Sequence, residues 1–195
     1  MSREATPRHP GHELILGGQR SGKSRCAESR AAAWLAGAGH SARLLVTALP
    51  GDAEMHERIA RHRRDRAERL PALVAIEVPR NLAQALREHS APKGLVVIDC
   101  LTLWLANLLM PLHGAALDDA AWAVQLASLE QALREAPGPV VLVSNEIGMG
   151  VSPLTAEARR FVDELGRLHQ AVARLSARVS LMVAGLEMPV KRGGA

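Results

Sequence analysis

The sequence predicts an α/β fold in which helices cover both faces of a mostly parallel central sheet, giving three layers. Short apolar runs alternate with longer segments whose apolar residues recur at helical spacing, as in parallel sheets joined by crossover helices. Several short runs are apolar at consecutive positions, which is typical of strands buried on both faces. The chain has 195 residues, 48% apolar and 23% charged, so one packed domain is expected.

The first half of the chain is expected to form three strands, each followed by a helix. The strands are residues 13–16, 43–47 and 73–77, and the helices are residues 23–37, 52–69 and 79–89. The strands are short apolar runs, whereas the helical segments carry apolar residues at a period of 3.6. Asp52 is suited to cap the second helix, because an Asp side chain can accept a hydrogen bond from the first turn.

The second half is expected to repeat this pattern. The strands are residues 95–99, 140–144 and 179–184, and the helices are residues 101–110, 118–135 and 155–177. The first two of these strands read LVVID and VVLVS, which suits the middle of a sheet. Residues 1–12 and 188–195 show no apolar periodicity and are expected to be loose tails, which leaves residues 13–187 as the folded domain.

A glycine-rich turn after the first strand is the sharpest signal in the sequence. Residues 14–24 read LILGGQRSGKS and contain G-x-x-x-x-G-K-S, the pattern of a phosphate-binding loop. Glycines let successive backbone N–H groups point at a phosphate, and the next helix begins at the same place. Lys23, one of only three lysines in the chain, is expected to bridge the outer phosphates, and the Ser24 hydroxyl to complete the shell of Mg²⁺. The expected nucleotide-binding residues of this single P-loop domain are Gly17, Gly18, Gln19, Arg20, Ser21, Gly22, Lys23 and Ser24.

Two acidic residues follow strands predicted to end near this loop. Asp99 ends an apolar strand, at the edge where open α/β sheets bind ligands, and is expected to act in catalysis and to hold Mg²⁺ or its waters. The alternative is an Asp that caps the helix starting at Leu101. Glu146 follows another strand and is expected to be catalytic, as a general base or a water-orienting group. Gly148 and Gly150 beside it fit a loop that moves over a ligand, and the alternative is a solvated loop acid.

The second predicted helix carries a histidine between arginines. On a helix, His62 lies on or beside the row of Met55 and Ile59, while Arg58 and Arg66 sit four residues away on either side. Two guanidinium groups would hold the imidazole neutral and attract phosphate oxygens, as a nucleophile towards a nucleoside triphosphate requires. The alternative is a solvated basic face with an incidental histidine. The other histidines (His9, His12, His40, His56, His89, His113 and His169) show no metal-ligand spacing and are expected at the surface or at helix caps.

Composition argues against several classes of function. The net charge of +4 is small for a whole domain, and the only aromatic residues are three Trp and one Phe, so nucleic-acid binding is not expected. The N-K-x-D signature of guanine-binding switch proteins is missing. The longest apolar stretch, Cys100–Leu112, is interrupted by polar residues and proline, so no membrane insertion is expected. Two cysteines, Cys26 and Cys100, make no disulfide framework, and a reducing, cytoplasmic location is expected.

With these residues in hand, the chain resembles the family of bifunctional adenosylcobinamide kinase / adenosylcobinamide-phosphate guanylyltransferase enzymes of cobalamin assembly. The matching segments run in family order over nearly the whole chain. They are GGQRSGKS at 17–24, VTA and D-x-E-M-x-x-R-I-x-x-H within 46–62, VVIDCLTLWLANLL at 96–109, VLVSNEIGMGVSP at 141–153, R-x-F-x-D-x-x-G at 159–166 and VAGL at 183–186. The P-loop is shared by many unrelated enzymes, whereas the segments with D-E-M-R-I-H and NE-x-GMG-V-x-P are far more specific.

The resemblance implies a RecA-like P-loop domain that uses ATP or GTP to phosphorylate the aminopropanol hydroxyl of adenosylcobinamide. It further implies that GMP from GTP is carried on a guanylylated histidine, matched here by His62, and delivered to adenosylcobinamide phosphate. The resemblance also implies a homotrimer whose active sites lie near the contacts between subunits. Two departures stand out: the family's Arg-Pro and Trp after the histidine helix read Arg66-Ala67-Glu68, and its G-x-x-N-Q places His169 where the family has Asn.

Two other functions stay open on the residues alone. One is a P-loop kinase of another small alcohol, in which His62 only positions phosphate. The other is a RecA-like ATPase that works on a partner or on nucleic acid, which the small net charge and the scarcity of aromatics disfavour.

Overall fold

The computed structural model describes residues 11–193, apart from 52–55, 58–59, 62–63 and 65–67. Its elements are β1 (Glu13–Gly17), α1 (Lys23–Leu35), β2 (Ser41–Val46), β3 (Val74–Glu77), α3 (Leu82–His89), β4 (Gly94–Asp99), α4 (Leu101–Leu109), α5 (Asp119–Glu135), β5 (Val140–Asn145), α6 (Ala156–Leu175), β6 (Arg178–Val183) and β7 (Leu186–Lys191). Between β2 and β3, the described residues 56–57, 60–61, 64 and 68–69 are helical. The other residues of the predicted helix 52–69 lie outside the described part of the chain.

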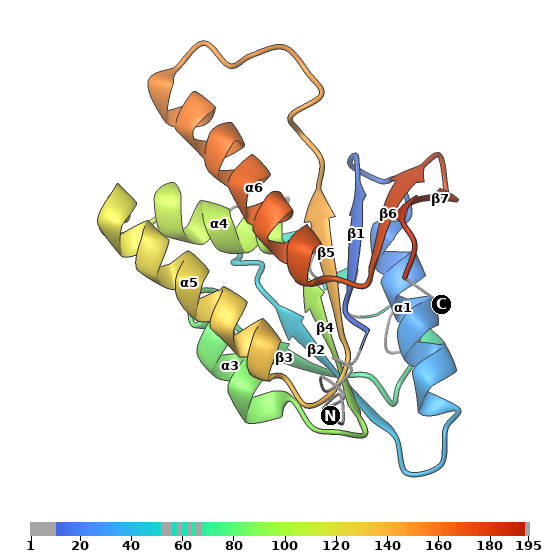
Figure 1. Ribbon diagram of the computed structural model, residues 1–195. Coiled ribbons are helices and arrows are strands. Elements are labelled where there is room, and N and C mark those ends of the chain that lie inside the picture. Colours follow the sequence, from blue (N-terminus) through green and yellow to red (C-terminus); the bar gives the residue numbers. More distant parts are fainter. Residues whose placement is uncertain (1–10, 52–55, 58–59, 62–63, 65–67, 194–195) are drawn as a thin grey trace, which may run out of the picture.

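The strands form one seven-stranded sheet in the order β3-β2-β4-β5-β1-β6-β7 (Figure 1). The pairs from β3 to β6 are parallel, and β6 pairs with β7 in the antiparallel direction. The predicted α/β class with a mostly parallel central sheet is therefore confirmed. Because β4, β5 and β1 are neighbours and parallel, their carboxyl ends lie together at one edge, and this edge positions the candidate site.

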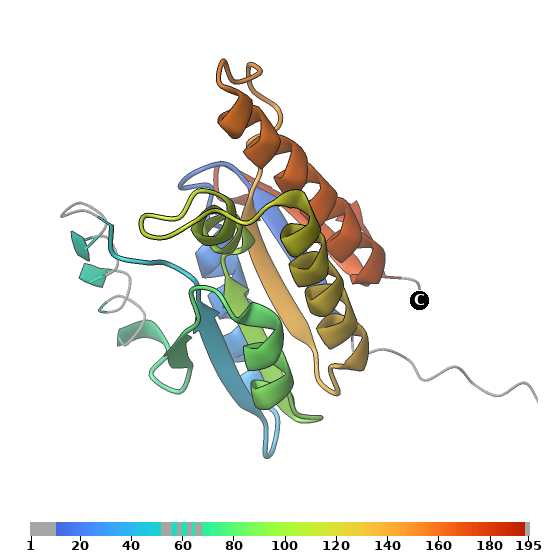
Figure 2. The same ribbon diagram turned by 90° about the vertical axis from the view of Figure 1, so that its left-hand side faces the viewer.

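The sheet is covered unequally on its two faces. Helices α3, α4, α5 and α6 lie on one face and α1 on the other, which completes the three layers (Figures 1 and 2). The larger core lies under the four helices, where the rings of Trp104 and Trp122 pack 5.5 Å apart. On the other face, α1 approaches the strands closely through the small residues Ala27 and Ala31. Neighbouring residues of β1 pack into different cores: Leu14 lies in the larger core and Ile15 in the smaller one. This is expected for a strand buried on both faces.

Helix α4 accounts for the longest apolar stretch of the sequence. Leu101, Trp104 and Leu105 are fully buried in it, and the Trp104 indole N–H donates to the Arg80 carbonyl at 2.8 Å. The helical part of the stretch therefore belongs to the core, whereas Met110 and Leu112 after it are exposed. Among the described residues, no helix has both the length and the apolar character that crossing a membrane requires.

The two predicted tails need correction within the described residues. Residues 186–191 form β7, so the prediction of a loose tail from residue 188 was wrong for residues 188–191. Every residue of β7 is exposed, and the strand is held by backbone pairing to β6, so it has no apolar pattern to detect. At the other end, His12 is buried: its Nδ1 accepts from the Val140 N–H at 3.1 Å, and its Nε2 lies 2.9 Å from the Leu133 carbonyl.

Candidate active site

The loop Gly17–Ser24 joins β1 to α1, and its backbone requires glycine at two positions. Gly17 has φ 153° and Gly22 has φ 100°, values that side chains disfavour. A Cβ atom on Gly17 would also lie 2.5 Å from the Met182 carbonyl oxygen. Gly22 is the N-cap of α1 and no side chain caps this helix, so its first N–H groups are available to a phosphate. Gly18, Gln19 and Arg20 are exposed at the tip of the loop, where Arg20 has φ 55°.

Lys23 is folded back into this loop. Its side chain is buried, with 7% of the residue exposed, and Nζ donates to the Gly18 carbonyl oxygen at 2.6 Å. Nζ also lies 3.5 Å from Ser21 Oγ. The ammonium group therefore lies within the curl of the loop, where a cation is best placed to meet phosphate oxygens.

Ser24 and Asp99 meet across the loop and the end of β4. The Ser24 hydroxyl donates to Asp99 Oδ2 at 3.0 Å. Both atoms are hard oxygen ligands of the type that Mg²⁺ prefers, and Mg²⁺ in phosphoryl-transfer sites commonly takes one or two protein oxygens plus the phosphates. Such a site needs no larger cluster, and the described residues contain no group of three or more His, Cys, Asp or Glu side chains suited to a metal. The N-cap of α4 is Cys100 without a side-chain cap, so Asp99 does not cap that helix.

Glu146, directly after β5, contacts other protein groups through its backbone N–H and through both carboxylate oxygens. Its backbone N–H donates to the Gly17 carbonyl at 3.0 Å, which joins it to the start of the phosphate loop. Its Oε1 accepts from the Gly148 N–H at 2.6 Å, and its Oε2 lies 3.6 Å from His169 Nδ1. The side chain is 21% exposed. The carboxylate is therefore oriented by protein groups and is not a freely solvated loop acid.

His169 on α6 is a polar neighbour of the site that sequence reasoning missed. It is 8% exposed, and its Nε2 lies 2.7 Å from Ser144 Oγ, so its predicted place at the surface or at a cap was wrong. Burial lowers the pKa of His169, and the nearby Glu146 carboxylate partly opposes this. A signal was present in the sequence: His169 lies one turn after Leu165 on the buried face of α6, beside Leu168 and Val172.

The thiol nearest to the site is chemically quiet. Cys100 follows Asp99 and is buried, and burial raises the pKa of its thiol to about 12, with the Asp99 carboxylate adding to the effect. Since only the thiolate is an effective nucleophile, Cys100 stays inert at neutral pH.

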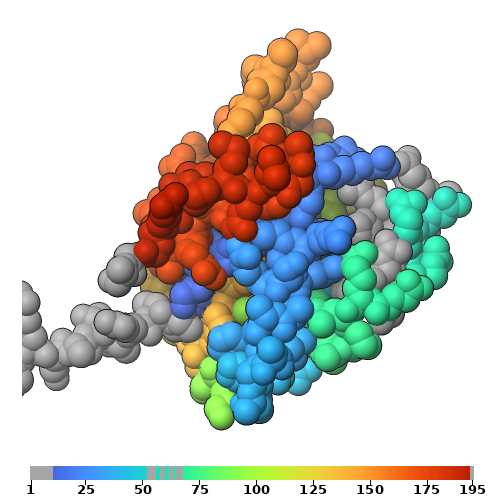
Figure 3. Space-filling view, turned by 90° about the vertical axis from the view of Figure 1, so that its right-hand side faces the viewer, coloured from blue at the N-terminus to red at the C-terminus, as the bar shows by residue number. Residues whose placement is uncertain are grey.

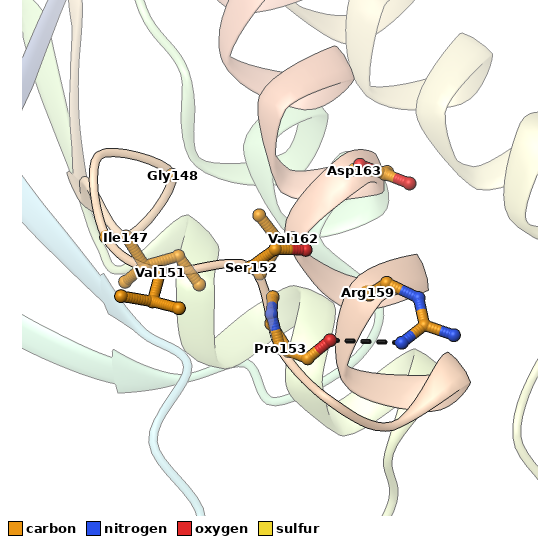
Figure 4. A pocket seen from close by; sticks show the side chains of 9 residues that line it. Ile147, Gly148, Val151, Ser152, Pro153, Arg159, Val162 and Asp163 are labelled. Atoms are coloured by element: carbon orange, nitrogen blue, oxygen red, sulfur yellow. Dashed lines mark hydrogen bonds between the residues drawn. The ribbon is translucent and has the colours of Figure 1, made fainter.

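The segment after Glu146 forms a long loop that projects beyond the sheet edge (Figures 1 and 3). Between this loop and the start of α6 lies an open pocket of about 180 Å³, lined by residues that include Ile147, Val151 and Val162 (Figure 4). The Arg159 guanidinium closes the far end of the loop by donating to the Pro153 and Leu154 carbonyls at 3.1 and 2.7 Å.

The second predicted centre lies outside the described residues. His62, Arg58 and Arg66 are all in this part of the chain, so the arrangement of the proposed nucleophile and its flanking arginines stays a prediction. The described residues Ala60, Arg61 and Arg64 around them are helical. The segment begins beside the site, because the backbone N–H of Thr47, directly after β2, donates to the Asp99 carbonyl at 3.1 Å.

Comparisons with known proteins agree in their result. A family model described as cobinamide kinase / cobinamide phosphate guanyltransferase matches residues 13–190. The bifunctional adenosylcobalamin biosynthesis protein CobP of Pseudomonas aeruginosa is 46% identical over 179 residues, which cover 92% of this chain and 96% of the relative. The bifunctional adenosylcobalamin biosynthesis protein CobU of Escherichia coli is 34% identical over 187 residues, covering 91% of this chain and 98% of the relative. Among solved structures, the flagellar accessory protein FlaH from Methanocaldococcus jannaschii shares the fold, with a TM-score of 0.52 and 14% identity over 95% of this chain and 80% of that chain.

Proposed function

Because the chain belongs to the cobinamide kinase / cobinamide phosphate guanyltransferase family of bifunctional enzymes, we propose that it phosphorylates adenosylcobinamide and then converts the product to adenosylcobinamide-GDP. ATP or GTP would serve as phosphoryl donor, and GTP as the source of GMP. Both reactions transfer a phosphorus group from a triphosphate, and the P-loop at the edge of the sheet is suited to hold one.

In the first reaction, the aminopropanol hydroxyl of adenosylcobinamide attacks the γ-phosphorus of the nucleotide. The new bond joins the hydroxyl oxygen to the γ-phosphorus, the bond to the β,γ-bridging oxygen breaks, and the nucleoside diphosphate leaves. Lys23 and the N–H groups of the loop stabilise the charge on the phosphoryl oxygens. Glu146 accepts the proton of the hydroxyl. Mg²⁺, when bound, neutralises the outer phosphates, and Ser24 and Asp99 are the residues that would hold it.

In the second reaction, His62 attacks the α-phosphorus of GTP and pyrophosphate leaves. An oxygen of adenosylcobinamide phosphate then attacks the guanylyl phosphorus, which breaks the nitrogen–phosphorus bond and frees His62. Arg58 and Arg66 would steady the triphosphate. The sequence spacing supports this assignment, as do the helical residues described on either side of His62.

The observation that carries the kinase proposal is the 3.0 Å hydrogen bond between Ser24 and Asp99. It joins the last residue of the phosphate loop to the acid that ends β4, residues 75 positions apart in the chain. Both groups offer the oxygen ligands that a magnesium-bound triphosphate would require. A glycine-rich turn that matched the P-loop pattern by accident would have no reason to meet a carboxylate there.

Incubation with Mg²⁺, GTP and adenosylcobinamide, followed by mass analysis of the products, tests the proposal. We expect adenosylcobinamide phosphate first and adenosylcobinamide-GDP later. With α-labelled GTP and no corrinoid, the protein itself should acquire label. A phosphorylated product without the GDP product or protein label would instead indicate a kinase alone.

We also propose that the protein is a homotrimer. Large apolar side chains are exposed on β7 and on the projecting loop, including Val190 at 67%, Val151 at 97% and Leu154 at 95%, and such surfaces suit burial against another subunit. Light scattering should give a mass three times the 20.9 kDa of one chain.

We propose that the reaction takes place in the cytoplasm, because both cysteines carry free thiols, as is usual in a reducing compartment.

A further inference from the structure

A line of buried polar groups connects α4 to Glu146 through the interior. The Asn145 N–H donates to Thr102 Oγ1 at 2.7 Å, and Thr102 Oγ1 lies 3.0 Å from Ser144 Oγ. Ser144 Oγ lies 2.7 Å from His169 Nε2, and His169 Nδ1 lies 3.6 Å from Glu146 Oε2. Ser144 is fully buried, and Thr102 and His169 are each 8% exposed. The line therefore begins at the backbone N–H of Asn145 and ends at the carboxylate of Glu146, whose own backbone N–H donates to Gly17 in the phosphate loop.

The hydroxyl groups of Thr102 and Ser144 can each donate or accept, and we infer the assignment that also gives the Glu146 carboxylate a donor. Thr102 Oγ1 accepts from a backbone N–H, so its own proton is free to be donated to Ser144 Oγ. Ser144 in turn donates to His169 Nε2, which must then be the unprotonated ring nitrogen. The ring proton is left on Nδ1, which faces Glu146. Each hydroxyl then donates once and accepts once, as buried hydroxyl groups require.

We propose that His169 is a positioning residue that acts through Glu146: as a neutral imidazole with its proton on Nδ1, it holds the Glu146 carboxylate towards the phosphate loop. The Gly148 N–H holds Oε1 at 2.6 Å, and Nδ1 of the ring faces Oε2 at 3.6 Å, so a protein donor group lies beside each oxygen. This inference rests on the proposed kinase reaction, in which Glu146 accepts the proton of the attacking hydroxyl. A base held in one orientation loses less entropy when that hydroxyl arrives.

The electrostatics around the ring agree with a neutral state. Burial lowers the pKa of His169 below its ordinary value of 6.5, and Glu146 is the charged group that opposes this shift. The elements packed against the ring contribute the hydroxyl groups of Thr102 and Ser144, and on α6 itself Glu164 is paired with Arg167. Protonation of His169 would reverse the Ser144 hydrogen bond and pair the Glu146 carboxylate with a cation, which makes it a poorer proton acceptor.

Three substitutions separate the roles of the two ring nitrogens. His169→Asn can keep a donor near the Nδ1 position, His169→Gln can keep a polar group near Nε2, and His169→Leu removes both. We expect kcat of phosphorylation to fall about 10- to 100-fold in the Leu variant, with KM for the nucleotide within about 2-fold of wild type. The Asn variant should stay within about 3-fold of wild type, and the Gln variant should resemble the Leu variant. His89→Leu, at the end of α3 on the opposite edge of the sheet, is the matched control, and thermal unfolding verifies that each variant is folded.

The dependence of the phosphorylation rate on pH distinguishes this role from a purely structural one, which would not change the pH profile. The wild-type rate should fall as pH decreases through the lowered pKa of His169, whereas the Asn variant has no imidazole there and should keep its rate over that range. A Leu variant with wild-type kcat would overturn the inference. So would an Asn variant that loses as much rate as the Leu variant.

A measurement without substrate tests the hydrogen-bond direction independently. In ¹⁵N NMR spectra of the ligand-free protein at pH 7, the His169 ring should be protonated at Nδ1 and unprotonated at Nε2. The opposite tautomer would overturn the inference, whatever the activity. A wild-type protein that fails to phosphorylate adenosylcobinamide would contradict the proposed function, and the ring tautomer would then decide the inference by itself.

Discussion

At the scale of single residues, we expect the ammonium group of Lys23 to lie beside the phosphoryl group that is transferred, because it sits within the curl of the phosphate loop. Lys23→Ala should lower the rate of phosphorylation roughly a thousandfold or more, because it removes a cation aimed at the oxygens of the transferred group. Single-turnover measurement with γ-labelled nucleotide gives this rate. Lys93→Ala, which removes an exposed lysine next to the opposite end of β4, is the control. A folded Lys23→Ala variant with near wild-type activity would contradict the P-loop assignment.

The carboxylate of Asp99 should matter through magnesium. In Asp99→Asn the amide oxygen can still accept the Ser24 hydrogen bond, but the negative charge is lost. We expect the Mg²⁺ concentration for half-maximal activity to rise about 10- to 100-fold, the range seen when the supports of a metal site are altered. A magnesium titration of activity measures this. Glu88→Gln on α3 removes the same charge far from the site and should leave the requirement unchanged, and equal behaviour of the two variants would remove Asp99 from the metal site.

Residues differ in how far the sequence reveals them. The need for glycine at positions 17 and 22 could be predicted, because it follows from the φ values of a single loop. A short sequence motif is enough to specify such a loop. His169 could not, because its environment is assembled from α4, β5 and α6, which are far apart in the chain. Ser24 and Asp99 are intermediate in this respect. Each could be predicted from its own motif, but the hydrogen bond between them depends on the order of the strands in the sheet.

At the scale of elements, side chains at both ends of β7 anchor the strand: Lys191 donates to the Ala173 and Ser176 carbonyls at 2.9 and 2.6 Å, and Glu187 binds the face that carries α1. Glu187 accepts from Ser180 Oγ at 2.7 Å and from Arg30, which also binds the buried carboxylate of Glu13. Figure 3 shows β7 next to α1 on this face. Glu187→Ala should speed amide hydrogen exchange in residues 186–191 and lower Tm by about 2 to 4 °C, the effect of losing one hydrogen-bonded anchor. The outward-facing Met188→Ala is the control.

The Glu187 anchor has a predictable pH dependence. The hydrogen bond from Ser180 and then the hydrogen bond from Arg30 lower the pKa of Glu187 below its ordinary value of 4.5. A carboxylate with a lowered pKa stabilises the folded state at neutral pH, and this contribution is lost as pH falls through the lowered pKa. The difference in Tm between wild type and Glu187→Ala should therefore shrink in acid. A difference that stays constant down to pH 2 would assign the effect to something other than the charge of Glu187.

Element boundaries could be predicted where a side chain marks them. The helix predicted at 118–135 is observed at Asp119–Glu135, because Asp118 accepts a hydrogen bond from the Ala121 N–H at 2.8 Å. Thr155 caps α6 in the same way. Strand β7 was missed because periodicity detects burial, and β7 buries no residue. The sequence therefore predicts the elements that form the core better than those that finish the edge.

At the scale of the whole molecule, the fold could be predicted because two independent signals agree. Doubly buried strands require covering helices, and the P-loop pattern requires a strand before it and a helix after it. The strand order that makes β4, β5 and β1 neighbours is a property of the complete sheet, and no single segment encodes it. This order places Asp99 and Glu146 at the ends of two adjacent strands, next to the phosphate loop. The site is thus less predictable than the elements that build it.

The two proposed reactions use different parts of the molecule, so one substitution should separate them. In the proposed mechanism, phosphoryl transfer depends on the loop after β1, on Asp99 at the end of β4 and on Glu146 after β5. GMP transfer would depend on His62 in the segment after β2. A neutral imidazole is a good nucleophile near pH 7, pyrophosphate is a good leaving group, and the phosphoramidate is reactive enough to pass GMP to a phosphate.

His62→Ala should therefore abolish GMP transfer and protein labelling by α-labelled GTP, while phosphorylation of adenosylcobinamide stays within a few-fold of wild type. Lys23→Ala should show the larger defect in phosphorylation, so the two variants should fail in different half-reactions. His56→Ala, an exposed histidine of the same segment, is the matched control and should keep both activities. Peptide mapping of the labelled wild-type protein gives the site directly. Label that persists in His62→Ala, or that maps to His56, would assign the nucleophile to another residue, because alanine has no ring nitrogen to bond to the guanylyl phosphorus.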